Sequence, residues 1–121
     1  MGFLFVALGG AAGAMGRYAM SLLPVRTGFP ILTLLVNILG AVLLGFIAGV
    51  AGDNSDVSPN TVLFWKTGVC GGFTTFSTFS LEAFTLFENK AWLAGGAYIF
   101  LSVAGCLAGI FLGKKLSMLA R

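Results

Sequence analysis

The sequence predicts an all-α membrane protein with four transmembrane helices per subunit. Of its 121 residues, 58% are hydrophobic and only 9% are charged, whereas an average soluble domain is about a quarter charged. Residues 27–52 and 91–113 contain no charged side chain, and roughly 20 apolar residues suffice to cross a bilayer. The connections between apolar stretches are short, so residues 1–121 are expected to form a single transmembrane domain.

The expected spans are, in chain order, residues 3–23, 31–50, 62–88 and 91–113. The first span contains Arg17, and the third contains Lys66 near its start and Glu82 near its end. Lysine and arginine are divided almost evenly between the two sides, and the excess that normally fixes orientation is about one charge. The weak bias permits insertion in both orientations, and therefore an antiparallel dual-topology homodimer with two-fold symmetry.

The composition excludes several classes of function. The seven basic residues are dispersed along the chain and form no cluster that could follow a nucleic-acid backbone. Histidine is absent, and Cys70 and Cys106 stand alone within apolar runs, which gives neither a zinc nor a redox motif. No nucleophile has a base near it in the sequence, so an enzyme is not expected.

Glycine is abundant, with 18 residues. Glycines recur at a spacing of four on each span, at Gly9 and Gly13, Gly45 and Gly49, Gly68 and Gly72, and Gly105, Gly109 and Gly113. Small residues at this spacing let helix backbones approach closely in lipid. We therefore expect tight helix packing within and between subunits.

The third span has the most unusual composition, because residues 71–82 read GGFTTFSTFSLE. Paired glycines lower helix propensity by about 1 kcal/mol each, which predicts a helix broken near residues 71–75. Irregular backbone within a membrane is tolerated only where protein or a polar cavity covers it. Its carbonyl oxygens would be suitable ligands for a small cation such as Na⁺.

Two stripes are expected along this span, one aromatic and one of hydroxyl groups, formed by Phe73, Phe76 and Phe79 and by Thr74, Ser77 and Ser80. Ring edges carry partial positive charge and can contact a small anion. Other polar residues within the spans are functional candidates by position, namely Arg17, Thr33, Asn37, Glu82, Tyr98 and Ser102. Two of these residues have two alternative roles each. Arg17 either attracts anions or extends to the membrane–water interface, and Glu82 is either a structural hydrogen-bond acceptor or a proton carrier.

Three motifs together resemble the Fluc (CrcB) family of fluoride channels. They are GGAAGAMGRY at Gly9–Tyr18, TLLVNILG at Thr33–Gly40 and GGFTTFSTFSLE at Gly71–Glu82. The resemblance covers essentially the whole chain. It implies a dual-topology homodimer with two fluoride pathways, placed as a multi-pass protein in the bacterial plasma (inner) membrane.

The resemblance also implies roles for individual residues. The paired pore phenylalanines correspond to Phe76 and Phe79, and the pore asparagine to Asn37. A structural Na⁺ at the dimer interface would be held by the backbone carbonyls of Gly71 and Thr74. The hydroxyl track corresponds to Thr33, Ser77, Thr78, Tyr98 and Ser102, and the polar residues typical of the family to Arg17 and Glu82. Cys106 stands where the track would continue one turn beyond Ser102.

The leading functional hypothesis is a passive, fluoride-selective channel that exports fluoride from the cytoplasm and so protects against its toxicity. One alternative is a small multidrug transporter, which has a similar outline but depends on a glutamate in the first span, where this chain has Arg17 and no carboxylate. Another alternative is a non-transporting subunit of a larger membrane complex.

Overall fold

The computed structural model describes residues 1–53 and 56–120, and this part of the chain is helical and contains no strand. The elements, in order, are α1 (Gly2–Ser21), α2 (Ile31–Asp53), α3 (Pro59–Val62), η1 (Leu63–Cys70), α4 (Gly71–Phe73), α5 (Phe76–Glu88) and α6 (Trp92–Leu119). Three of them, α1, α2 and α6, are long and apolar enough to cross a membrane.

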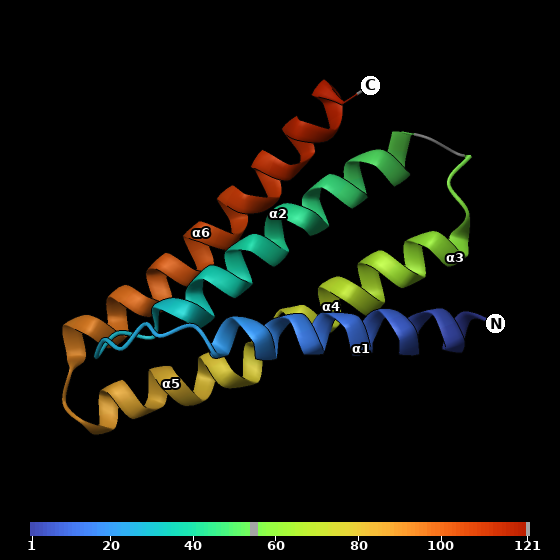
Figure 1. The fold of residues 1–121 in the computed structure, drawn as a ribbon. Helices are drawn as coiled ribbons and strands as arrows, with labels where there is room; N and C mark the ends of the chain where they lie inside the picture. The colour runs from blue at the N-terminus through green and yellow to red at the C-terminus, as the bar shows by residue number, and fades with distance from the viewer. Residues whose placement is uncertain (54–55, 121) are drawn as a thin grey trace.

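The helices form two pairs that splay apart (Figure 1). Helix α2 lies along α6, and α1 lies along η1 and α4. Both termini and the start of α3 lie at one end of the molecule, while α5 lies near the start of α6 at the other. Helix α2 contacts α6 along much of its length and meets η1 and α4 at fewer places.

Both pairs are held together by close approach at glycine, as the spacing of the glycines predicts. A Cβ atom added to Gly9 would clash with the carbonyl of Phe64, and one added to Gly13 with the carbonyl of Val69. In the other pair, a Cβ on Gly113 would clash with the carbonyl of Val42. Backbones pack this closely only where no side chain intervenes.

The predicted spans agree with the observed helices in position but not in every boundary. Helix α6 continues through Lys114 and Lys115 to Leu119, and α2 continues to Asp53. The expected span over residues 62–88 is a succession of segments, of which the longest is the 13-residue α5. Within the described residues, regular helix therefore runs without interruption in three of the expected spans, and the interrupted one is the span in which the break was expected.

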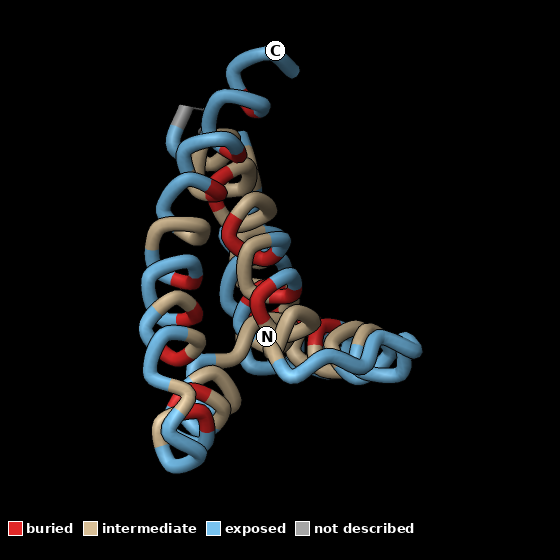
Figure 2. The backbone as a smooth tube through the Cα atoms, turned by 90° about the vertical axis from the view of Figure 1, so that its left-hand side faces the viewer, coloured by how far each residue is buried: buried red, intermediate tan, exposed pale blue. Residues whose placement is uncertain are grey.

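Little of the chain is buried against itself. Buried residues form narrow strips along the inward sides of the helices (Figure 2), and only 11% of the apolar window of α1 is buried. Large apolar side chains such as Phe3, Leu93 and Phe76 are mostly exposed. Surfaces of this kind are stable only in contact with lipid or another protein surface.

Candidate functional site

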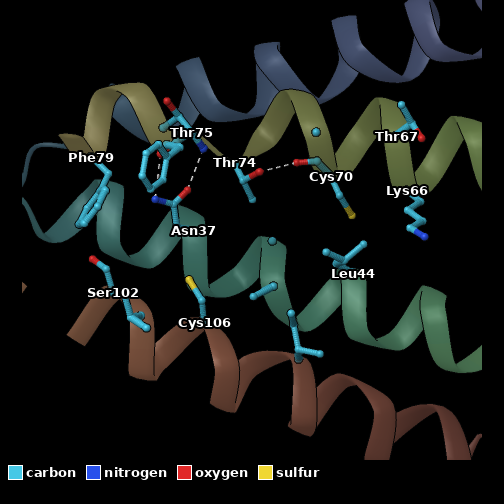
Figure 3. Close-up of a pocket in the computed structure, with 16 residues that line it drawn as sticks. Asn37, Leu44, Lys66, Thr67, Cys70, Thr74, Thr75, Phe79, Ser102 and Cys106 are labelled. Atoms are coloured by element: carbon cyan, nitrogen blue, oxygen red, sulfur yellow. Dashed lines mark hydrogen bonds between the residues drawn. The ribbon is translucent and has the colours of Figure 1, made fainter. Parts of the chain in front are cut away.

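The regular helix is interrupted at Thr74 and Thr75, within the range expected from the sequence. Thr74 (φ −83°, ψ 158°) and Thr75 (φ −149°, ψ 116°) are both extended, and α5 begins directly after them. The side chain of Asn37 from α2 pairs with the backbone here (Figure 3). Its Nδ2 donates to the Thr75 carbonyl at 3.1 Å, and its Oδ1 accepts from the Thr75 N–H at 2.8 Å.

This pairing leaves one carbonyl of α4 without the backbone N–H that would donate to it in a regular helix. In a continuous helix the Thr75 N–H would donate to the carbonyl of Gly71, but it donates to Asn37 instead. The Gly71 carbonyl thus loses its regular helical donor. The next carbonyl, that of Gly72, accepts a hydrogen bond from Nε of Arg17 on α1 at 3.1 Å. Arg17 therefore contacts the end of the broken helix.

The glycine pair does not itself form the break, which corrects the cause assigned from sequence. Gly71 and Gly72 both lie in α4 with helical geometry, and no glycine among the described residues has a positive φ. A Cβ on Gly72 would clash with the carbonyl of Gly10, so this glycine is required for packing against α1. The two threonines and the amide of Asn37 form the break.

Thr75 also starts the following helix. Its side-chain oxygen accepts from the Thr78 N–H at 3.2 Å, which satisfies one of the free donors at the start of α5. The Thr75 hydroxyl in turn donates to the Thr78 hydroxyl at 3.0 Å. One residue therefore pairs with α2 through its backbone and caps α5 through its side chain.

The aromatic residues do not form one continuous stripe, so that expectation is wrong. Phe73 precedes the break and packs toward Gly16 and Gly40, away from the other rings. Phe76 and Phe79 follow the break, with ring centroids 5.6 Å apart. Phe79 also contacts Tyr98 at 5.1 Å. The break rotates the chain between Phe73 and Phe76, which separates residues that a regular helix would align.

Tyr98 is fully buried, and its hydroxyl donates to Oε1 of Glu82 at 2.9 Å. Phe29 contacts the Tyr98 ring edge-to-face, with centroids 5.5 Å apart. Glu82 thus accepts a hydrogen bond from a buried hydroxyl.

A cavity of about 650 Å³ lies between η1, α2 and α6, beside the break (Figure 3). Its walls include Asn37, Phe76, Phe79 and Ser102. Ser102 is 7% exposed, and its hydroxyl oxygen has no hydrogen-bond partner among the described residues. A buried hydroxyl without a partner is costly, so this group marks a position suited to a polar ligand or water.

A smaller cavity of about 100 Å³ adjoins the break and is lined in part by Arg17, Thr33 and Thr78. Thr75 lines both cavities. Thr75 at the break is therefore shared by the wide cavity and the narrow one. Ser77, by contrast, is exposed and lines neither of these two cavities.

One segment of the site has no counterpart in the sequence-based expectations. Leu63–Cys70 is a π-helix, in which the hydrogen bonds span five residues rather than four. Residues that line the wide cavity recur at a spacing of four from this π-helix to the break, at Lys66 and Cys70 within it and at Thr74 beyond α4. A regular α-helix of 3.6 residues per turn would rotate the last of these away from the first. The wider turns help to keep them on one face.

Sequence reasoning identified Asn37, Phe76, Phe79 and Ser102, and the structure brings these residues together around one cavity. It did not identify Thr75 as a site residue. The sequence contained a signal for it, because an in-span asparagine needs a polar partner and the predicted break offers free backbone groups. No comparable signal in the sequence indicated the π-helix.

The chain belongs to the CrcB family. It matches the family described as CrcB-like protein, Camphor Resistance (CrcB), over residues 4–114. It is 45% identical over 116 residues to a fluoride-specific ion channel FluC of Methanococcus maripaludis, covering 95% of this chain and 94% of that protein. It is 44% identical over 115 residues to the FluC of Ruminiclostridium cellulolyticum, covering 93% and 88%. A third FluC, from Pyrococcus furiosus, is 45% identical over 113 residues, covering 93% and 92%.

Proposed function

We propose that this protein is a passive, fluoride-selective ion channel that exports fluoride from the cytoplasm. The observation that carries the proposal is the similarity, over more than nine tenths of the chain, to proteins named fluoride-specific ion channels. Fluoride enters cells as the neutral weak acid and is retained as the anion in a more alkaline cytoplasm. A channel lets the membrane potential drive the anion out.

The proposed pathway follows the two cavities on either side of the break. On the wide side, the ring edges of Phe76 and Phe79 face an anion, and the hydroxyl of Ser102 replaces part of its hydration shell. On the narrow side, Thr33 and Thr78 do the same. Two facts support this route: the Ser102 hydroxyl has no partner among the described residues, and the two hydrogen bonds of Asn37 use only one of its two amide N–H groups.

For two residues of the predicted hydroxyl track, Tyr98 and Ser77, the proposed role differs from that of the other hydroxyl groups. Tyr98 donates its hydrogen to Glu82, so in this conformation it orients Phe79 rather than donating to an anion. Ser77 is exposed on α5, and in the proposed assembly it would reach the ion only from a surface that faces the partner subunit.

We further propose that the functional unit is a dual-topology homodimer in which each subunit crosses the membrane four times, as a multi-pass protein of the bacterial plasma membrane. The broken segment η1–α4–α5 supplies the fourth crossing. Support comes from Phe76, which is 79% exposed beside the break, and from the open cavity next to it. A second, antiparallel copy would cover these apolar groups and complete the pathway walls.

A structural Na⁺ at the dimer interface is proposed on the carbonyls of Gly71 and Thr74. The donor set fits, because carbonyl oxygens are hard ligands and the Gly71 carbonyl has lost its regular helical donor. Gly71 is also exposed and lines the wide cavity. The ion would join the two broken helices of the dimer across the interface.

Efflux from liposomes tests the function. Purified protein is reconstituted, the vesicles are loaded with fluoride, and release is followed with a fluoride electrode and compared with release from protein-free vesicles. We expect rapid fluoride release that requires a counter-ion pathway for potassium. Release equal to that from empty vesicles would overturn the proposal, and export of cationic dyes against a proton gradient would favour a multidrug transporter instead.

A further inference from the structure

We propose that Lys66 is an entry residue for anions: its ammonium group draws fluoride into the wide cavity and raises the rate at which the ion reaches the break. The inference rests on the proposed function of the chain as a fluoride channel. Lys66 is the only charged side chain among the 16 residues drawn around this cavity (Figure 3). It is neither part of the predicted pathway nor involved in the hydrogen bonds at the break.

The position of Lys66 in the chain supports this role. It lies in the middle of Leu63–Cys70, between Trp65 and Thr67, in a stretch that is otherwise uncharged. A lysine within a membrane segment is costly unless it faces water, an opposite charge or the interface. The side chain is exposed, and no ion pair is recorded for it in residues 1–53 and 56–120. Lys66 is both exposed and part of the cavity wall, so its ammonium is available to an ion that enters there.

The geometry connects this charge to the ion site. Lys66, Cys70 and Thr74 lie at a spacing of four on one wall of the cavity, and Asn37 and Thr75 stand at the end of that wall. An anion attracted to Lys66 is thus on the same surface as the groups that bind it. An ammonium is a compact, strongly hydrated charge without a fixed planar set of donors, so it concentrates anions without holding one in a fixed geometry.

The expected effect is electrostatic and depends on salt. Charged clefts raise the encounter rate of an oppositely charged ion by about tenfold or more, and we expect about two- to fivefold from one lysine in an open cavity. The screening length is about 30 Å at 0.01 M salt and about 3 Å at 1 M. The contribution of Lys66 is therefore expected at low ionic strength and absent at high ionic strength, whereas a packing role would persist in both.

The test measures initial fluoride efflux per protein for the wild type, Lys66→Met, Lys66→Arg and Lys115→Met, at low fluoride. Ionic strength is set to about 0.01 M or 1 M with an impermeant sulfate salt, kept equal on both sides of the membrane. Lys115 is exposed on α6 over the ring of Phe111 and does not line the cavity, so its substitution matches the loss of net charge. Gel filtration in detergent confirms that each variant assembles like the wild type.

We expect Lys66→Met to lower the rate about two- to fivefold at low salt and to match the wild type at high salt, with Lys66→Arg and Lys115→Met close to the wild type in both. Equal rates for wild type and Lys66→Met at low salt would overturn the inference. So would a loss that persists at high salt, or one that Lys115→Met shares. Absence of fluoride release from the wild type would overturn the proposed function, and the inference with it.

Discussion

Replacing Asn37 with leucine is expected to destabilise the protein and to stop most fluoride flux. The two hydrogen bonds of Asn37, at 3.1 Å and 2.8 Å, satisfy both backbone groups of Thr75. Leucine is branched at the same carbon but has no polar group, so the N–H and the carbonyl of Thr75 lose their partners. An unsatisfied buried group costs about 1–3 kcal/mol. Two such groups would cost about 2–6 kcal/mol, and re-pairing of the Thr75 N–H with the Gly71 carbonyl offsets part of this, so we expect a total loss of about 2–4 kcal/mol.

Asn37→Leu should also lower the rate of fluoride efflux, which a neutral substitution at the surface should not do. Loss of the pairing frees the Thr75 N–H to return to the Gly71 carbonyl, which would turn Phe76 and Phe79 away from the cavity. A barrier higher by about 1.4 kcal/mol reduces a rate tenfold, so fluoride efflux is expected to fall at least tenfold. The assays are denaturant unfolding in mild detergent and efflux from liposomes.

Asn89→Leu provides the matched control, because Asn89 is exposed after α5 and no side-chain hydrogen bond is recorded for it within the described chain. This variant should resemble the wild type in both assays. If Asn37→Leu left the free energy of unfolding unchanged and the flux within about twofold of the wild type, the pairing would not be what holds the break.

Three further predictions follow from the packing and the proposed ion site. Gly9→Ala should cost about 1–3 kcal/mol of stability, because its Cβ would clash with the carbonyl of Phe64, whereas the neighbouring Gly10→Ala meets nothing within 4 Å and should be neutral; equal unfolding midpoints would contradict this. Tyr98→Phe should destabilise by about 1–3 kcal/mol, since it leaves the carboxyl group of Glu82 without its donor; an unchanged free energy of unfolding would count against that hydrogen bond. Replacing sodium by a bulky organic cation throughout purification should lower fluoride efflux and restore it when sodium returns; flux independent of sodium would count against the proposed cation site.

Much of the fold follows from the sequence, because membrane helices obey simple rules. Apolar length located α1, α2 and α6, with Arg17 as the one charge within α1, and the glycine spacing identified the faces that pack. The boundaries were less accurate: α6 continues through Lys114 and Lys115, since lysine side chains can extend from a helix to water without ending it.

The site was predicted in part, and the errors have a common cause. The break and its neighbours Asn37, Phe76 and Phe79 were expected, but the break was attributed to local glycine propensity. In the structure its partner is a side chain from another helix, 38 positions away in sequence. The continuous aromatic stripe failed for the same reason, because a period read along the chain presumes that the helix is unbroken. Contacts that depend on tertiary structure are not visible in local patterns.

Fluoride selectivity is best measured as the reversal potential of single channels in a planar bilayer, with fluoride on one side and chloride on the other. The current should reverse far toward the fluoride equilibrium potential, because the phenylalanine edges and the hydroxyl groups form a site for a small anion. A reversal potential near zero, which indicates equal permeability to both halides, or the absence of any fluoride current from well-folded protein, would contradict this prediction.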